Sequence, residues 1–400
     1  MGKIFLYILV LVLLEVSCKE EKIYRPDIVA DLSVQIIPAE ESLKMSSFFK
    51  TTYDIIVPEG VVLAGVSKVL VKDSLMIVEG KTGDGFIHLF DKKGQFIETI
   101  LKRGGGPSEA ANIWAMKIYN DNVYFLVNAG TEIMCYSLTN RKVIDRFRMP
   151  NEIVSIADFE ILSDKEFIFY KNLTGMIDED EFKLYMFDRE RKEVIERWIP
   201  LHAESSEYIS FAQHDCLYYQ DGKIRFYEVF QKGIYELEEK QLKGYVSFED
   251  NEYAIPDNEL YGRYTFDSFI DFCMRSPYVW AHRGVMEGSR FIFSNYTYRE
   301  KYYWNVIDKK KGKSKSFLKI DDDIFLEEKM LAEDYPFQTN KQDSVQYFTI
   351  SYDQLADVME KKRKNGSFDS FSKSHPEVVK IYEKSSIDTN DLIIMLYEEE

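Results

Sequence analysis

The sequence is short of positive charge. Its 51 Lys and Arg residues stand against 68 Asp and Glu residues, which gives a formal net charge of −17 at pH 7. Proteins that bind nucleic acid need clustered Lys and Arg to contact the phosphate backbone. The composition therefore predicts no nucleic-acid partner.

Cysteine is also scarce, with four residues in 400. Cys18 lies near the N-terminus, and the other three are widely spaced and form no Cys-x-x-Cys pair. An odd number of scattered cysteines is not a disulfide framework. We expect Cys135, Cys216 and Cys273 to act as small buried hydrophobic residues.

No hydrophobic run is long enough to span a membrane, which takes about 20 residues. The longest run, Ile4–Leu14, has eleven residues and follows Lys3, which is typical of a secretory signal peptide. Ser17 and Cys18 come next and resemble the lipobox of bacterial lipoproteins. In that family the cysteine becomes the first mature residue and carries the lipid. Glu15 stands where the family usually has an aliphatic residue.

The lipobox resemblance implies a signal peptide over residues 1–17, a lipid on Cys18 and a tether over residues 18–32. The segment Lys19–Lys22, with sequence KEEK, looks like the short acidic export tag of surface lipoproteins from some Gram-negative anaerobes. Each buried CH₂ group adds about 0.8 kcal/mol, so a multiply acylated cysteine anchors a protein stably. We expect an outer-membrane lipoprotein displayed on the surface, with the membrane as its partner through the lipid. The alternative is an ordinary secretory signal with a coincidental cysteine.

Motifs that carry catalysis or bind metal are missing. The sequence has no H-E-x-x-H pair, no G-x-S-x-G elbow and no sialidase-type Asp box. Two acidic runs, Asp178–Glu181 and Asp321–Asp323, lack the spacing of a calcium loop and are predicted to be solvated turns. We therefore predict no catalytic residue, no metal site and no cofactor. The histidines are scattered over the chain at His88, His202, His214, His282 and His375.

What the sequence does contain is a repeat. An apolar strand, a charged turn and a second β-rich segment recur five times, as in FIHLF-DKKG-QFIETI and YWNVI-DKKK-GKSKSFL. The turns are separated by intervals of 47, 50, 49 and 71 residues, with centres at Lys93, Asn140, Glu190, Glu239 and Lys310. Another pair of strand candidates precedes several of these hairpins. Four antiparallel strands in about 50 residues match a blade of a β-propeller.

The ends of the chain supply a further blade. Ser33–Pro38, Tyr53–Pro58 and Asp391–Tyr397 are strand-like segments without a complete blade of their own. Pairing them would close the ring and remove an exposed sheet edge. We predict an all-β fold over residues 33–400. It is a single six-bladed propeller of four-stranded antiparallel blades, closed by the N- and C-terminal strands, with five or seven blades as the range.

A small helical insertion is predicted at about 351–384. Ser351 and Gln354 have the spacing of a capping box. Leu355, Val358 and Met359 then follow on one helix face, and Asn365-Gly366 would end the helix. Pro376 could begin a second short helix.

A glycine-rich segment lies between the first two blades. In Lys102–Ala110, the residues Gly104, Gly106, Pro107 and Glu109 match the G-x-G-P-G-E-F signature of six-bladed β-propeller lipoproteins, a family related in shape to NHL-repeat propellers. Ser108 and Ala110 depart from it. The resemblance implies a propeller fold and an envelope location, but no established reaction. We expect a tight inter-blade loop here. The alternative, a phosphate cradle, lacks the G-x-x-x-x-G-K-[ST] pattern.

One segment is richer in chemistry than the rest. Arg275, Tyr278, Trp280, His282 and Arg283 lie close together and are followed by five further aromatic residues between Tyr296 and Trp304. Aromatic rings with Arg and His could form a stacking face for a sugar or peptide. The alternative is that these aromatics fill the space between blades.

Two functions remain open. The first is a noncatalytic, membrane-anchored propeller, monomeric outside any complex, that acts as a binding or scaffold module for a glycan, a peptide or an outer-membrane protein. The second is a propeller enzyme, a lyase or hydrolase, with an axial site built from several blades.

Overall fold

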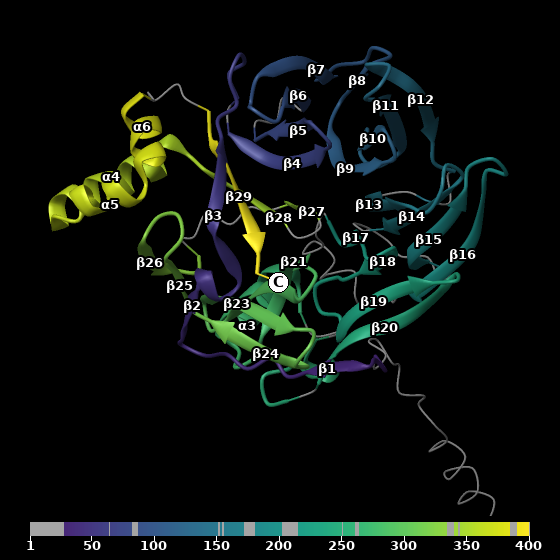
Figure 1. Ribbon diagram of the computed structural model, residues 1–400. Helices are drawn as coiled ribbons and strands as arrows, with labels where there is room; N and C mark the ends of the chain where they lie inside the picture. The colour runs from purple at the N-terminus through teal and green to yellow at the C-terminus, as the bar shows by residue number, and fades with distance from the viewer. Residues whose placement is uncertain are drawn as a thin grey trace, which may run out of the picture.

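The computed structural model describes residues 28–399 except 64, 82–86, 151–152, 154–155, 172–180, 202–214, 250, 261–263, 334–339, 343–344 and 385–389. The predicted signal peptide, Cys18 and most of the predicted tether lie outside the described residues. The described chain forms antiparallel sheets arranged around a central axis (Figure 1). The all-β propeller with four-stranded antiparallel blades is thus confirmed.

Six of the sheets contain four antiparallel strands each. Sheet 1 comprises β4 (Val66–Lys72), β5 (Leu75–Gly80), β6 (Ile87–Asp91) and β7 (Phe96–Arg103). Sheet 2 comprises β9 (Ile113–Tyr119), β10 (Asn122–Val127), β11 (Glu132–Ser137) and β12 (Lys142–Arg148). Sheet 3 comprises β13 (Ile156–Ile161), β14 (Glu166–Lys171), β15 (Phe182–Asp188) and β16 (Glu193–Pro200).

The remaining three four-stranded sheets complete the set. Sheet 4 comprises β17 (Leu217–Gln220), β18 (Lys223–Phe226), β19 (Gly233–Glu238) and β20 (Gln241–Phe248). Sheet 5 comprises β21 (Trp280–Glu287), β22 (Phe291–Tyr298), β23 (Lys301–Asp308) and β24 (Lys313–Phe317). Sheet 6 comprises β27 (Asn340–Gln342), β28 (Val345–Ile350), β29 (Leu392–Glu398) and β3 (Phe49–Ile56). Sheets 1 and 4 each gain a short parallel edge strand, β8 (Glu109–Ala110) and β1 (Leu32–Val34).

The predicted count of six was wrong, because the described residues form seven sheets. The seventh sheet has three strands, β2 (Ser42–Lys44), β25 (Lys319–Asp322) and β26 (Glu328–Leu331), and β2 pairs with β25 in parallel. A single-turn 3₁₀ helix, Met45–Ser47, follows β2. The prediction of a solvated turn at Asp321–Asp323 is also corrected. Asp322 is buried, and its Oδ1 accepts hydrogen bonds from the backbone N–H groups of Ile324 and Phe325 at 3.1 and 2.8 Å.

Strands from the two ends of the chain close the ring, as predicted. β29 pairs with β3 in antiparallel register, with Ile393 opposite Ile56 and Leu396 opposite Tyr53. The other N-terminal segment behaves differently from the prediction, because β1 joins sheet 4 beside β20. Five hairpins of the sequence repeat are the outer strand pairs β6–β7, β11–β12, β15–β16, β19–β20 and β23–β24.

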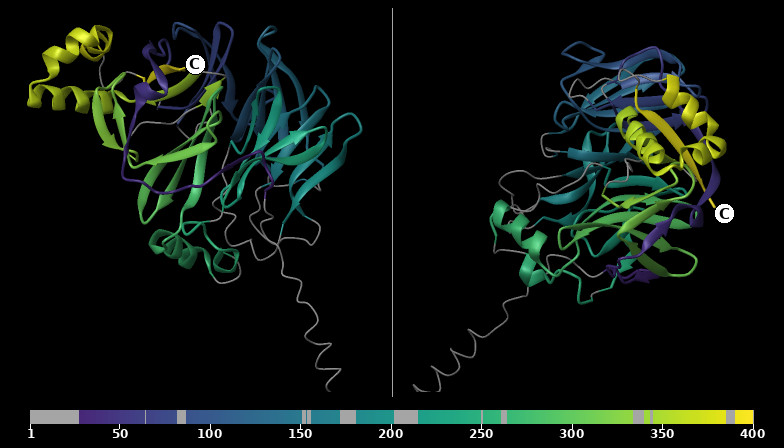
Figure 2. Two further views of the ribbon diagram at one scale, coloured as in Figure 1. Left: turned by 60° about the horizontal axis from the view of Figure 1, so that its bottom comes forward. Right: turned by 90° about the vertical axis from the view of Figure 1, so that its left-hand side faces the viewer.

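Helices decorate the ring at two places. The predicted insertion is present as α4 (Tyr352–Asn365), α5 (Phe368–Ser374) and α6 (Pro376–Lys384), which stand to one side of the ring (Figure 2). Ser351 and Gln354 form the reciprocal capping box, and Gly366 ends α4 at φ 79°. The sequence analysis missed α2 (Asp257–Leu260) and α3 (Phe266–Arg275), which occupy the long interval between sheets 4 and 5.

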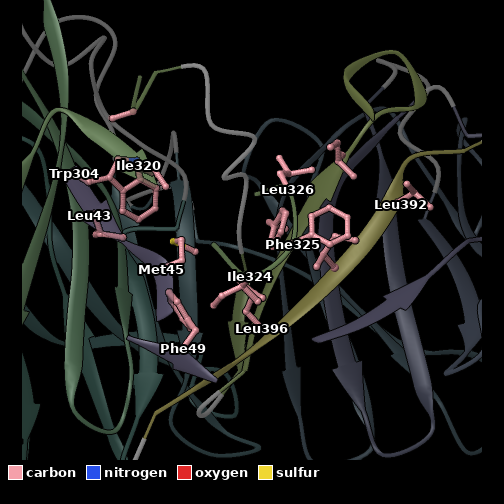
Figure 3. Packing of buried hydrophobic residues seen from close by; sticks show 14 of the residues in the cluster. Leu43, Met45, Phe49, Trp304, Ile320, Ile324, Phe325, Leu326, Leu392 and Leu396 are labelled. Carbon is pink, nitrogen blue, oxygen red and sulfur yellow. The ribbon is translucent and has the colours of Figure 1, made fainter. Parts of the chain in front are cut away.

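The hydrophobic core lies between neighbouring sheets. Its largest cluster joins sheets 5 and 6 to the seventh sheet and the helical insertion, and includes Phe49, Ile320, Phe325 and Leu396 (Figure 3). The three cysteines Cys135, Cys216 and Cys273 are free and buried, as predicted. Within the described part of the chain, no helix combines the length and the apolar character needed to cross a membrane.

Candidate functional site

The glycine-rich loop lies between β7 of sheet 1 and the start of sheet 2, with Pro107 in its turn. Gly104 N donates to Ala110 O at 3.0 Å, and Gly106 N donates to Glu109 Oε2 at 2.9 Å. A Cβ on Gly104 would lie only 2.0 Å from that same carboxylate oxygen. A side chain at position 104 would therefore displace the Glu109 side chain, which folds back over the glycine.

The Arg146 side chain of sheet 2 binds the backbone of this loop. Arg146 Nη1 donates to the carbonyl oxygens of Gly106 and Glu109 at 3.4 and 3.2 Å. The same guanidinium contacts Glu132 at 2.7 Å, and Arg148 contacts the other oxygen of Glu132, also at 2.7 Å. The loop thus uses its polar groups within the protein, as a joint between two sheets.

The structure describes the side chains of three of the five residues predicted to form a ligand face, Arg275, Tyr278 and Trp280. Arg275 ends α3 and pairs with Asp271 on the same helix at 2.9 Å. Trp280 is 6% exposed and packs with Phe269 and Cys273. Trp280 is therefore not available as a stacking surface, and this part of the prediction was wrong, because α3 covers the ring.

The remaining residues of that prediction divide into two groups. Tyr278 is half-buried and lies against Phe272, with ring centroids 6.2 Å apart. His282 and Arg283 belong to β21, but their side chains lie outside the described part of the structure. Further along, Tyr296 and Tyr303 are buried and stacked, with centroids 5.3 Å apart. These two rings fill the space between sheets, as the alternative interpretation of this segment held.

Charged side chains from the first strands of sheets 2 and 3 meet near the axis of the ring, beside the first strand of sheet 4. Lys117 Nζ on β9 lies 3.3 Å from Asp158 Oδ1 and 3.6 Å from Glu160 Oε2, both on β13. It also donates to the carbonyl oxygen of Leu217 on β17. Lys68 of sheet 1 pairs with Asp215 beside this cluster.

Burial dominates the electrostatics of this axial cluster. It raises the pKa of Asp158 and of Glu160, and the neighbouring Lys117 offsets only part of that effect. Burial by itself would lower the pKa of Lys117, but the two carboxylates outweigh it and raise that pKa. Asp158 Oδ2 also accepts from Leu217 N at 2.8 Å. The cluster joins three sheets, and its charged atoms bind one another and the backbone.

A second charged cluster lies between sheets 4 and 5 and centres on Glu287. The Glu287 side chain, at the end of β21, is 0% exposed. Its Oε1 accepts from Tyr245 Oη at 2.6 Å and from Lys309 Nζ at 2.9 Å. Its Oε2 accepts from Tyr218 Oη at 3.0 Å and lies 3.6 Å from Arg225 Nε. Donors from two sheets therefore saturate one buried carboxylate.

A row of side chains with alternating negative and positive charge runs from Glu287 to the surface. Arg225 Nη1 lies 2.6 Å from Glu236 Oε2. The other oxygen of Glu236 contacts Lys223, and Lys223 lies 3.1 Å from Glu238 Oε1. Lys243 then lies 2.8 Å from Glu238 Oε2. Burial disfavours the charge of Arg225, but Glu287 and the other partners raise its pKa overall.

This chain of ion pairs opens into a groove of about 710 Å³ between sheet 4 and the β23–β24 turn of sheet 5. We call it the lysine groove, because five of its lining residues are lysines. The other charged residues of the lining are three acids. Tyr245, two glycines and Leu32 make up the rest. The lining residues are Asp31, Leu32, Lys223, Glu236, Glu238, Lys243, Gly244, Tyr245, Lys309, Lys310, Lys311 and Gly312.

The sequence analysis did not identify this groove. It noted the Lys-rich turn at 309–311 only as one turn of the repeat. Lys223 and Lys243 come from two other strands, and only the packing of sheet 4 against sheet 5 brings them next to that turn. In the described part of the chain, no three His, Cys, Asp or Glu side chains gather as a metal site.

The fold and the groove define the class of protein: this is a β-propeller with a charged groove between two of its sheets. More particularly, the chain belongs to the family described as "Domain of unknown function (DUF4934)", whose model matches residues 37–398. No curated protein matches the chain significantly. These comparisons provide no support for a relation to NHL-like or lipoprotein families, which stays a prediction.

One solved structure shows the same fold. A crystal structure of a "Putative exported protein" from Bacteroides fragilis is 14% identical in sequence, with a TM-score of 0.67, and the match covers 92% of this chain and 99% of that one. The hydrazine synthase of Kuenenia stuttgartiensis is also 14% identical, with a TM-score of 0.36 over 62% of this chain and 65% of that one. The first match supports the propeller fold, and the second supports no conclusion.

Proposed function

We propose that this protein is a noncatalytic, lipid-anchored β-propeller that binds an acidic glycan in the lysine groove. The observation that carries the proposal is the charge of the groove. Its lining holds five lysines and three acids, whereas the whole chain has a net charge of −17. Beyond about 8 Å salt screens the field of the remaining surface, so an anion responds mainly to the groove itself. There Lys223, Lys243, Lys309 and Lys311 already pair with carboxylates of the protein, and an external anion binds by competing with these carboxylates.

The wall of the groove suits a charged sugar better than a neutral one. Neutral sugars are held mainly by stacking on an aromatic face. The aromatic residue of the lining is Tyr245, and the guanidinium of Arg225 lies over its ring at 3.9 Å, while its hydroxyl is bound to Glu287. Lysine ammonium groups bind carboxylate, sulfate or phosphate groups through charge-assisted hydrogen bonds.

The axial cluster gives the enzyme alternative little support. A lyase or hydrolase would need an acid or base that can reach a substrate. Asp158 and Glu160 are buried, and Lys117 and backbone N–H groups occupy their oxygens. Their raised pKa values follow from burial in a joint between sheets.

The proposed location is the outer membrane, with the propeller displayed on the surface. The signal-like N-terminus and Cys18 support anchoring, and the Bacteroides relative of the same fold carries a name that describes it as exported. The groove lies close to where the tether meets the propeller, since Asp31 and Leu32 line it. A Cys18→Ala variant should move from the membrane fraction to the soluble fraction, and an unchanged distribution would contradict the anchor.

Binding is tested by calorimetry on the mature lipoprotein in detergent, with tetragalacturonic acid as the acidic probe and cellotetraose as the neutral one. The variant Lys310→Glu/Lys311→Glu reverses two groove charges. The matched control, Lys361→Glu/Lys364→Glu, makes the same change of net charge on α4. We expect the groove variant to weaken tetragalacturonate binding at least tenfold and the control less than twofold. Equal losses in both variants, or no binding by the wild type, would refute the proposal.

A further inference from the structure

We infer that Glu238 occupies a carboxylate subsite of the lysine groove, formed by Lys223 and Lys243, and that a carboxylate of the ligand replaces it. This inference rests on the proposed function and specifies the chemistry of its ligand. Lys223 Nζ lies 3.1 Å from Glu238 Oε1, and Lys243 Nζ lies 2.8 Å from Glu238 Oε2. Each ammonium group therefore holds one oxygen of a single carboxylate.

The subsite is open to solvent. The side chains of Lys223, Glu238 and Lys243 are 39%, 40% and 53% exposed. Ion pairs at such positions are weak, because water and salt compete with them. An external carboxylate on a multivalent chain can therefore displace Glu238 without disturbing the core.

The backbone positions of the two lysines do not depend on the Glu238 carboxylate. Lys223 also contacts Glu236, which Arg225 holds from the buried side at 2.6 Å. Lys243 lies on β20 directly after the β19–β20 turn, where Gln241 pairs with Glu238. Strand pairing thus fixes the backbone of both lysines, and Lys223 keeps a second carboxylate partner when Glu238 leaves.

The turn beside Glu238 is a two-residue hairpin turn with both central residues at positive φ, like the turn at Arg299 and Glu300. Glu239 and Lys240 have φ values of 48° and 65°, in the left-handed region that favours glycine. Such a turn fixes the end of β19 and sets the direction in which Glu238 leaves the strand. The hydrogen bonds from Lys243 and Lys223 lower the pKa of Glu238. The hydrogen bonds to Glu236 and then to Glu238 raise the pKa of Lys223, and the hydrogen bond to Glu238 raises the pKa of Lys243. All three groups are therefore charged at neutral pH.

The Glu238 carboxylate, which the two lysines hold in this structure, indicates the class of ligand. The two lysines are already matched to a planar carboxylate with two oxygens, and uronic acids carry this group on each sugar unit. A glycan of linked uronic acids can place one carboxylate in this subsite while its neighbours contact Lys310 and Lys311 across the groove. We therefore expect a polyuronate to bind better than a phosphate-bearing ligand.

The test compares Glu238→Gln with Glu193→Gln by calorimetry with tetragalacturonic acid. Glu193 is an exposed carboxylate on sheet 3 that pairs with Arg191 at 3.7 Å, so the control removes the same charge far from the groove. We expect Glu238→Gln to tighten binding five- to twentyfold and Glu193→Gln to change it less than twofold. The methyl-esterified tetramer should not bind to either variant.

The outcomes separate the two proposals. If Glu238→Gln leaves the affinity unchanged or lowers it while Lys310→Glu/Lys311→Glu still weakens binding, the subsite is wrong and the groove stands. If inorganic phosphate competes as well as galacturonate does, the site is a general anion site and the carboxylate assignment is overturned. If the wild type binds no tetragalacturonate, the proposed function fails and this inference fails with it.

Discussion

Replacing Glu287 by alanine should destabilise the propeller strongly. Glu287 is the buried acceptor that joins sheet 5 to sheet 4, and Tyr218, Tyr245, Lys309 and Arg225 all face it. The alanine variant would leave the guanidinium of Arg225, 4% exposed, with half of its charge partners. Breaking a buried ion pair by removing one partner costs about 3–5 kcal/mol.

This loss can be read as a change in melting temperature. The entropy of unfolding is about 2.1 cal/mol/K per residue near 60 °C, so a domain of roughly 360 residues has about 0.8 kcal/mol/K. A loss of about 4 kcal/mol therefore lowers Tm by about 5 °C. Differential scanning calorimetry of the wild type and of Glu287→Ala measures this shift directly.

Two further variants decide whether the reasoning holds. Glu193→Ala removes an exposed carboxylate and should change Tm by less than about 1 °C, because such pairs contribute about 0–1 kcal/mol. Arg225→Met/Glu287→Met replaces both charges by apolar groups and should recover part of the loss of Glu287→Ala. A Tm change below about 1 °C in Glu287→Ala would show that water still reaches this carboxylate, and the account of the cluster would be wrong.

Two other predictions concern the loop motif and a half-buried tyrosine. Gly104→Ala should lower stability by about 1–3 kcal/mol in thermal unfolding, because the new Cβ displaces Glu109 from its hydrogen bond. In the control Gly105→Ala the new Cβ meets no atom within 4 Å, so stability should not change. Equal losses in the two variants would contradict this account. Burial, with the carboxylates around it, raises the pKa of Tyr53 to about 12. Its contribution to stability is therefore complete below about pH 10 and is lost as the pH rises from 10 through 12. Urea unfolding across this range should show a smaller decline in Tyr53→Phe than in the wild type, whereas Tyr219→Phe, at a side chain 60% exposed, should decline like the wild type.

Local patterns in the sequence identified most of the ring. The hairpin from β11 to β12 shows strand-forming residues on both sides of a polar turn, and this signal needs no distant contact. The capping box at Ser351 is equally local. In contrast, the pairing of β2 with β25 joins a three-residue strand to a four-residue strand from the opposite half of the chain, and no periodicity in either segment indicates it.

The candidate site was harder to predict because proximity in space created it. Lys223, Lys243 and Lys309 belong to three elements, and each resembles an ordinary solvated lysine in the sequence. The prediction that Trp280 contributes to a ligand face failed for a related reason. Trp280 has the chemistry of a sugar-stacking residue, but α3 packs over it. A capping pattern at Thr265 and Ser268 marked the start of that helix and could have revealed it.

The closure of sheet 6 has a consequence for biosynthesis. β3 lies near the beginning of the chain and its partner β29 lies at residues 392–398. All strands of sheets 1 to 5 precede β29 in the chain, and until β29 is present β3 and β28 both have unpaired edges of the kind that promote aggregation. A product truncated before residue 392 cannot satisfy these edges. Only a chain that includes β29 can therefore complete sheet 6.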